Sequence, residues 1–182
     1  AGIACWDNAY AEEKELDSSQ FGCQRVQISN NTLVDETGGR GALILNQDAR
    51  EMVIAHNIII RDRFDAYEIT GRSGVGLTST ANAYSAQVVD ESPGAVLVDS
   101  DSASGSVTGF SVQEGLDHFV APGFAPWVLL DGPWPVLNPD RPDYHLRGDS
   151  SWATIANPAY SPSLDQDGEA RTGNVIGAFT IR

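Results

Sequence analysis

The sequence ISNNTLV occupies residues 28–34 and returns as IAHNIII at residues 54–60. Asn57 follows Asn31 by 26 residues, and a weaker third copy places Asn82 another 25 residues further on. β-Branched residues flank the first two asparagines, and the three- and four-residue apolar spacing of an amphipathic helix is absent. A repeat of this length predicts stacked strands, in which equivalent residues of successive coils lie roughly 4.8 Å apart.

The asparagine at the centre of each repeat predicts a hydrogen-bonded ladder. Asn31, Asn57 and Asn82 are expected to point inward, each amide bonding to the amide one coil away. A polar binding site is the alternative, but the coil spacing favours the ladder. His56 directly precedes Asn57, so strand alternation places it on the opposite face, where we expect an exposed surface or groove residue, with a catalytic histidine as the alternative.

The expected fold class is all-β: a solenoid of stacked strands with an irregular C-terminal segment. The chain is long enough for one domain, with coils in residues 1–98 and an irregular tail and cap in residues 99–182. Residues 99–109 are rich in Ser, Gly and Asp and are expected to form an exposed loop. Residues 119–136 contain four prolines, which remove ladder donors and exclude an ordinary coil there.

The formal net charge of −14, from 25 acidic and 11 basic residues, is strongly negative. Such a surface repels nucleic acid and anionic membranes. No apolar run approaches the ~20 residues that a membrane-spanning helix needs. The first residues lack the basic and apolar regions of a signal peptide, so secretion would require a signal already removed or carried on a longer precursor.

The two cysteines, Cys5 and Cys23, bracket a polar stretch at residues 7–22. We predict a disulfide at the base of this loop, which would contribute roughly 3 kcal/mol through loop entropy. Such a bond implies an oxidising compartment. Two buried free thiols are the alternative.

The densest charged cluster lies at a predicted coil corner, in residues 61–68. Arg61 and Arg63 alternate and would share a face, with Asp62 opposite. Asp65 and Glu68 offer oxygen ligands of the kind that Ca²⁺ prefers. A solvated corner with weak ion pairs is the alternative.

Two further segments carry residues of potential function. Trp127 and Trp134 suit stacking on sugar rings, or a hydrophobic cap over the end of the coils. Residues 165–168, DQDG, resemble the opening of a calcium loop. Glu169 and Arg171 do not complete that pattern, so a structural turn is expected there.

The C-terminal motifs are the second strong signal in the chain. They read DYHLRGDSSWA at residues 143–153, DQDGEAR at 165–171 and GNVIGAF at 173–179. This arrangement resembles the tail of secreted right-handed parallel β-helix repeat proteins, and residues 28–34 and 56–60 resemble their coil consensus. The resemblance implies that the all-β solenoid is a right-handed parallel β-helix, and it covers most of the chain, weakly between residues 82 and 143. That family includes polysaccharide lyases, glycoside hydrolases, epimerases and surface proteins.

The resemblance implies chemistry without fixing it. Family lyases abstract the proton α to a uronate carboxyl group, using a base and a cation or Arg. Arg61, Arg63 and Asp62 are then the catalytic candidates, with Trp127, Trp134 and His56 binding substrate. Hydrolases instead need paired carboxylates, which Asp62 and Asp65 could supply.

Two functions therefore remain open at this point. The first is an extracellular carbohydrate-active protein, a polysaccharide lyase if it is an enzyme, with Ca²⁺ held by Asp65 and Glu68. The second is a non-catalytic structural or cell-surface subunit. Members of the family carry more coils before such a tail, so we expect another chain, or the N-terminal half of a precursor, to stack on the coil that starts at Gly2–Trp6.

Overall fold

A computed structural model gives the fold, and the residues that it describes are 3–6, 23–35, 44–47, 50–62, 65–70, 76–86, 88–90, 105–122 and 142–182. The strands before residue 100 are β1 (Ile3–Trp6), β2 (Gln27–Ser29), β3 (Thr32–Asp35), β4 (Ile44–Gln47), β5 (Val53–Ala55), β6 (Ile58–Arg61), β7 (Tyr67–Thr70), β8 (Thr78–Thr80), β9 (Ala83–Tyr84) and β10 (Val88–Asp90). The elements that follow are β11 (Val107–Thr108), helix α3 (Val112–Leu116), β12 (Phe119–Ala121), β13 (Asp143–Leu146) and 3-10 helices at Ser151–Thr154 and Pro158–Tyr160.

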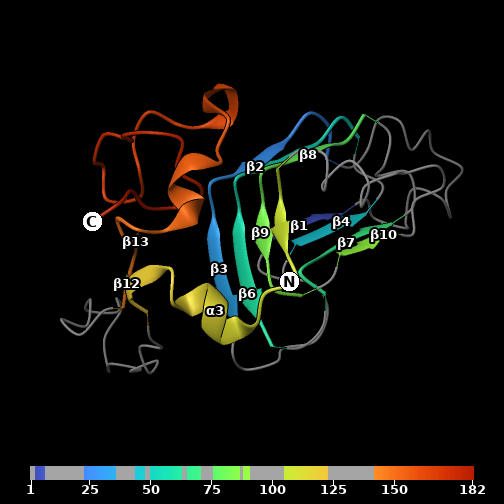
Figure 1. The fold of residues 1–182 in the computed structure, drawn as a ribbon. Helices are drawn as coiled ribbons and strands as arrows, with labels where there is room; N and C mark the ends of the chain where they lie inside the picture. The colour runs from blue at the N-terminus through green and yellow to red at the C-terminus, as the bar shows by residue number, and fades with distance from the viewer. Residues whose placement is uncertain are drawn as a thin grey trace, which may run out of the picture.

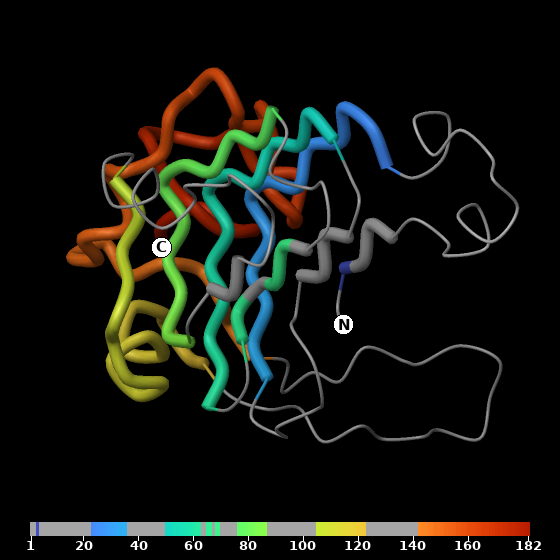
Figure 2. The backbone as a smooth tube through the Cα atoms, turned by 90° about the vertical axis from the view of Figure 1, so that its right-hand side faces the viewer, coloured from blue at the N-terminus to red at the C-terminus, as the bar shows by residue number. Residues whose placement is uncertain are grey.

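Three stacks of parallel strands form the body of the molecule (Figure 1). Their orders are β1-β4-β7-β10, β2-β5-β8 and β3-β6-β9-β11. The register aligns the repeats, with Ile28 opposite Ile54 and Thr32 opposite Ile58. Figure 2 shows the strands of the third stack running side by side.

The described residues after β11, 109–122 and 142–182, are called the C-terminal part below. They depart from the parallel pattern and contradict the predicted fold class. β12 and β13 form an antiparallel pair in which Phe119 lies opposite Leu146. Helix α3 and the 3-10 helices come after β11 in the chain, and in Figure 1 they lie next to the third stack. The chain thus combines parallel and antiparallel sheets with short helices, so the predicted all-β right-handed parallel β-helix is wrong, because the sheets do not form a clear solenoid.

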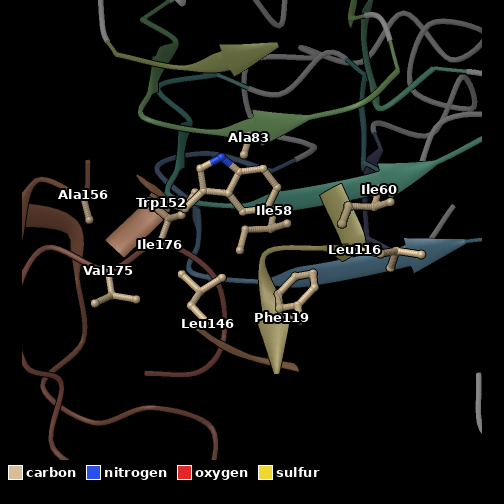
Figure 3. Packing of buried hydrophobic residues seen from close by; sticks show 10 residues of the cluster. All are labelled: Ile58, Ile60, Ala83, Leu116, Phe119, Leu146, Trp152, Ala156, Val175 and Ile176. Atoms are coloured by element: carbon tan, nitrogen blue, oxygen red, sulfur yellow. The ribbon is translucent and has the colours of Figure 1, made fainter. Parts of the chain in front are cut away.

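Burial on both faces of β6 is the physical reason for this difference. Ile59 packs in one hydrophobic cluster with Ile54 and Met52, while Ile58 and Ile60 pack in a second cluster. The second cluster is completed by residues of the C-terminal part, as Figure 3 shows: Leu116, Phe119, Leu146, Trp152, Ala156, Val175 and Ile176. The outer face of the third stack is therefore an interior layer, which explains the three successive isoleucines of β6.

The predicted asparagine ladder is confirmed. Asn57 Oδ1 accepts hydrogen bonds from the backbone N–H of Asn31 at 3.1 Å and from its Nδ2 at 2.9 Å. Asn82 Oδ1 accepts the same two bonds from Asn57, at 2.9 Å and 3.1 Å. The residue before each ladder position has positive φ: 55° at Asn30, 59° at His56 and 50° at Ala81.

A fourth rung follows where the sequence predicted a loop. The backbone N–H of Asn82 donates to Ser106 Oγ at 3.0 Å, and Gly105 before it has φ of 84°. Val107 and Thr108 then pair in parallel with β9. The loop predicted for residues 99–109 is therefore wrong at residues 107–108, because a serine replaces the asparagine that marks the other repeats.

Candidate functional site

The outer edge of the first repeat is the first candidate surface. β1, β2 and β3 are the first strands of the three stacks, and each has a strand partner on one side only within the described residues. Leu33 of β3 is half-buried, whereas its in-register neighbour Ile59 is fully buried. The edge therefore presents both backbone groups and part of the hydrophobic interior.

The predicted catalytic corner is organised around a buried guanidinium. The Arg61 side chain is 1% exposed and forms an ion pair from Nη2 to Asp35 Oδ2 at 3.0 Å. Its Nη1 donates to the carbonyl of Asp65 at 2.8 Å. Ser85 Oγ accepts from the Arg61 backbone N–H and donates to its carbonyl. Arg61 thus ties β3 to β6 and to the residue that follows β9, and the solvated corner considered above is wrong for this residue.

The other residues of that corner are less closely joined. Asp62 is exposed, Asp65 and Glu68 are half-buried, and Arg63 lies outside the described residues. Within the described part of the chain, no three His, Cys, Asp or Glu side chains form a preformed metal-binding group. The catalytic role of Arg61, Asp62 and Arg63, and the Ca²⁺ role of Asp65 and Glu68, stay predictions.

His56 is buried, which contradicts the predicted exposed position. Its Nε2 accepts the backbone N–H of Asn157 at 2.8 Å, and its Nδ1 lies 3.3 Å from Ser161 Oγ. Its carbonyl accepts the N–H of Gly177 at 2.7 Å. Burial, with a smaller effect of Arg171, lowers the pKa of His56 to about 4. His56 lies in the left-handed turn between β5 and β6, and the segment that contains Asn157 and Ser161 covers its side chain.

The predicted disulfide is also wrong. Cys23 is a half-buried free cysteine that packs against the first hydrophobic cluster. Cys5 lies in β1, paired with Asn46 of β4, in a different stack from β2, which begins shortly after Cys23. The side chain of Cys5 lies outside the described residues, as do Trp127 and Trp134, so the sugar-stacking role of the tryptophans stays a prediction.

The C-terminal motifs dock the chain onto the parallel stacks. Arg171 Nη2 donates to the carbonyls of Gly177 and Ala178, at 2.8 Å and 3.0 Å. The N–H of Ala178 in turn donates to Thr32 Oγ1 at 3.0 Å. A Cβ on Gly177, whose φ is 82°, would lie 2.5 Å from Ile58 Cδ1. The glycine therefore allows the close approach that seals the second hydrophobic cluster.

The structural turn predicted at residues 165–168 is confirmed. Asp165 Oδ1 accepts the N–H groups of Asp167 and Glu169, at 2.9 Å and 2.8 Å. Its Oδ2 accepts the N–H of Thr180 at 3.1 Å. Burial acts to raise the pKa of Asp165, but the hydrogen bonds from Glu169, Thr180 and Asp167 leave it lowered. The carboxylate serves as the fixed centre of the turn.

A second charged cluster, which the sequence did not reveal as a site, surrounds His145. Its Nδ1 lies 2.6 Å from Asp143 Oδ1, while its Nε2 lies 3.5 Å from Asp167 Oδ2 and 4.0 Å from Asp165 Oδ2. Arg182 contacts Asp143 and Asp167, at 3.3 Å and 3.5 Å. The sequence signal was the pair of tail motifs at 143–153 and 165–171, but their spacing gave no indication that they meet.

Ser150 and His118 form a third polar contact, with Oγ and Nδ1 2.8 Å apart. The His118 ring stacks on Trp152 with 3.9 Å between centroids, and burial lowers its pKa. Ser150 is buried and also accepts the N–H of Trp152, as the cap of a 3-10 helix. This serine is accounted for by capping.

Comparison with known proteins gives no relative: no family model, curated protein or solved structure matches the chain. No helix in the described residues is long and apolar enough to cross a membrane.

Proposed function

We propose that this protein is a non-catalytic structural subunit that assembles with another chain through the edge formed by β1, β2 and β3. The observation that carries the proposal is the state of Asn31 at the end of the ladder. Its Nδ2 donates to Asn57 Oδ1 and to the carbonyl of Ser29, and its backbone N–H donates to Asn57. No described residue donates to its Oδ1, although Asn57 and Asn82 each accept two bonds at that atom.

The ladder specifies the chemistry of the partner. In the two complete rungs, the donors to Oδ1 are the backbone N–H and the side-chain amide of one asparagine. An asparagine in the turn between two extended strands would offer both donors to Asn31 in the same geometry. The partner that fits is therefore another chain with parallel strands and an asparagine in register, added as a further layer.

Apolar contacts at the same edge support the proposal. Ile3, Val26 and Leu33 pack against the first hydrophobic cluster and are only half-buried. Covering them would add hydrophobic burial to the backbone hydrogen bonds that an edge strand seeks. Because the chain carries a net charge of −14, an acidic partner would be repelled at low salt, so added salt should strengthen its association.

Sedimentation velocity across a range of protein concentrations tests whether a second copy acts as this partner by stacking head to tail, with the strands β8, β10 and β11 that end its stacks laid against the β1, β2 and β3 edge. We expect association that rises with salt and is lost in Leu33→Lys. Because Leu33→Lys could unfold the chain, Gln27→Lys, at an exposed position of β2, provides a second edge variant. Val120→Lys is the matched control, since Val120 is an exposed apolar residue on β12.

The outcome that contradicts the proposal is equally defined. A wild-type chain that stays monomeric at every salt and protein concentration would refute self-assembly through this edge. Association that persists unchanged in both edge variants, once circular dichroism shows them folded, would place the contact elsewhere.

The carbohydrate-directed function, the secreted or cell-surface location and a polysaccharide partner rest on the resemblance alone and stay predictions. Arg61 is committed to Asp35 in the interior, so a lyase reaction there would require that ion pair to open. Incubation with uronate polysaccharides, followed by absorbance of unsaturated product ends, tests this alternative directly.

A further inference from the structure

We propose that His145, Asp165 and Asp167 bind a divalent transition-metal ion of the Zn²⁺ class, with Asp143 as the carboxylate that orients the histidine. This site is separate from the assembly edge, and its proposal does not depend on the proposed function. It joins the sequence motifs at residues 143–153 and 165–171, which are separated in the chain by the 3-10 helix at Pro158–Tyr160.

The orientation of His145 is fixed by Asp143. The His145 side chain is 4% exposed, and its Nδ1 lies 2.6 Å from Asp143 Oδ1. The same carboxylate oxygen accepts the backbone N–H of His145 at 3.0 Å. A carboxylate acceptor at Nδ1 favours a ring proton on that nitrogen, an arrangement in which Nε2 is available as a metal ligand. Histidine ligands of metal ions are usually held in this way.

The free ring nitrogen faces two further carboxylates. His145 Nε2 is buried and makes no hydrogen bond. It lies 3.5 Å from Asp167 Oδ2 and 4.0 Å from Asp165 Oδ2. The position between Nε2 and these two carboxylate oxygens is electronegative, and a cation bound there would contact all three atoms. The arrangement thus points to a bound positive ion.

The separations suit a small ion with nitrogen and oxygen ligands. Zn²⁺ in tetrahedral coordination lies about 2.0–2.2 Å from histidine nitrogen and carboxylate oxygen, so neighbouring ligand atoms are about 3.4 Å apart. The 3.5 Å separation between His145 Nε2 and Asp167 Oδ2 matches this spacing, and the 4.0 Å separation to Asp165 Oδ2 would have to shorten on binding. Asp165 is the rigid ligand, because three backbone N–H groups hold its carboxylate.

Asp167 is the ligand that can move, and Arg182 competes with the metal ion for its carboxylate. The Asp167 side chain is 37% exposed, and Arg182 Nη2 lies 3.5 Å from its Oδ2. These residues are not a preformed metal group, so the ion has to draw Asp167 away from Arg182. Arg182 contacts Asp143 and Asp167, and the Arg171 guanidinium interacts electrostatically with Asp165, so two guanidinium groups offset three carboxylates and leave negative charge for a cation to neutralise.

Isothermal titration of the full chain with Zn²⁺ at pH 7 tests the proposal, with Co²⁺ absorption as a second readout. We expect saturable binding of one ion, weakened at least about tenfold in Asp167→Asn and about 10–100-fold in Asp143→Asn. Arg182→Gln should tighten binding, because it removes the competing cation. Asp149→Asn is the matched control, since Asp149 is an exposed carboxylate paired with Arg147.

A spectroscopic measurement on the wild-type chain keeps the proposal testable even if a variant fails to fold. The ring nitrogens of His145 in the wild-type chain should report Zn²⁺ in ¹⁵N NMR, with the large change at Nε2 and not at Nδ1. Absence of saturable binding up to about 1 mM Zn²⁺ would refute the site. Binding that Asp167→Asn leaves unchanged, or that shifts only the other histidines, would show an adventitious surface ion only.

Discussion

At the scale of single residues, inward-facing amides hold the order of the parallel strands. Asn57 is fully buried and uses its amide on both sides: Oδ1 accepts from Asn31, while Nδ2 donates to Asn82 Oδ1 and to the carbonyl of Ile28. A buried amide of this kind is stabilising only while each group has its partner, because an unpaired buried polar group costs free energy.

Asn57→Asp is therefore expected to destabilise the fold by about 3 kcal/mol, since it places a carboxylate beside two acceptor oxygens. Urea unfolding of the variant measures this loss. Asn31→Asp, at the half-buried end of the ladder, is the control and should lose clearly less. Equal stability of Asn57→Asp and the wild type would refute the role of the ladder.

His56 gives the fold a dependence on pH. Its pKa is lowered to about 4 from an ordinary value of 6.5, so the unfolded chain binds its proton more readily. The free energy of unfolding should then be at its full value above pH 6.5 and fall as the pH drops toward 4. Protonation also converts Nε2 from an acceptor into a donor that opposes the N–H of Asn157.

Urea midpoints at pH 7.5, 6.0 and 5.0 test this prediction. His56→Asn should show a flatter profile, and asparagine tolerates the positive φ at this position. His118→Gln is measured in parallel, because burial lowers the pKa of His118 in the same direction. A profile of His56→Asn as steep as that of the wild type would contradict the assignment.

At the scale of elements, the docking of the C-terminal part depends on close approach at one glycine. Gly177 and Gly168 have nearly the same φ, at 82° and 83°. A Cβ on Gly177 would meet Ile58 and Thr32 at 2.5 Å and 2.9 Å, whereas a Cβ on Gly168 would meet no heavy atom within 4 Å. Comparing alanine substitutions at Gly168 and Gly177 therefore separates the cost of backbone strain from the cost of a packing clash.

We expect Gly168→Ala to cost about 1 kcal/mol, which is the strain of a left-handed residue. Gly177→Ala should cost about 1–3 kcal/mol more, because it also forces Ile58 and Thr32 apart. Chemical denaturation of the two variants side by side checks the difference. Equal losses would mean that the C-terminal part adapts to the added methyl group.

At the scale of the whole molecule, the centre of the stacks and its outer edge differ in protection. Ile58, Ile59 and Ile60 of β6 are fully buried between two hydrophobic clusters, and β6 has strand partners on both sides. β3 has a partner on one side within the described residues, and Leu33 is half-buried. The backbone amides of β6 should therefore exchange with solvent more slowly than those of β3.

Hydrogen exchange followed by mass spectrometry is expected to show slow exchange in peptides covering residues 53–61 and faster exchange in residues 27–35. If the edge assembles, exchange in residues 27–35 should slow at high protein concentration, while Leu33→Lys should abolish that change. Slowing confined to β12 or to the Asp165 turn would place the interface in the C-terminal part instead.

The sequence by itself determined which strands lie side by side, because a repeat of 25 or 26 residues with asparagine in register encodes its own neighbours. It also determined the Asp165 turn, since that carboxylate bonds to N–H groups two and four residues away. Both features depend on periodicity or on local geometry, which sequence patterns record.

Only the tertiary structure decided what covers those strands. The bond from Asn157 to His56 spans 101 residues, and no local pattern indicates that these segments meet. The burial of Arg61, the free thiol of Cys23 and the convergence of Asp143, His145 and Asp167 likewise come from packing between distant segments. The alternation of residues along a strand predicts which face of the sheet a side chain lies on. Whether that face is exposed to solvent or covered by a second layer depends on hydrophobic burial by the rest of the chain.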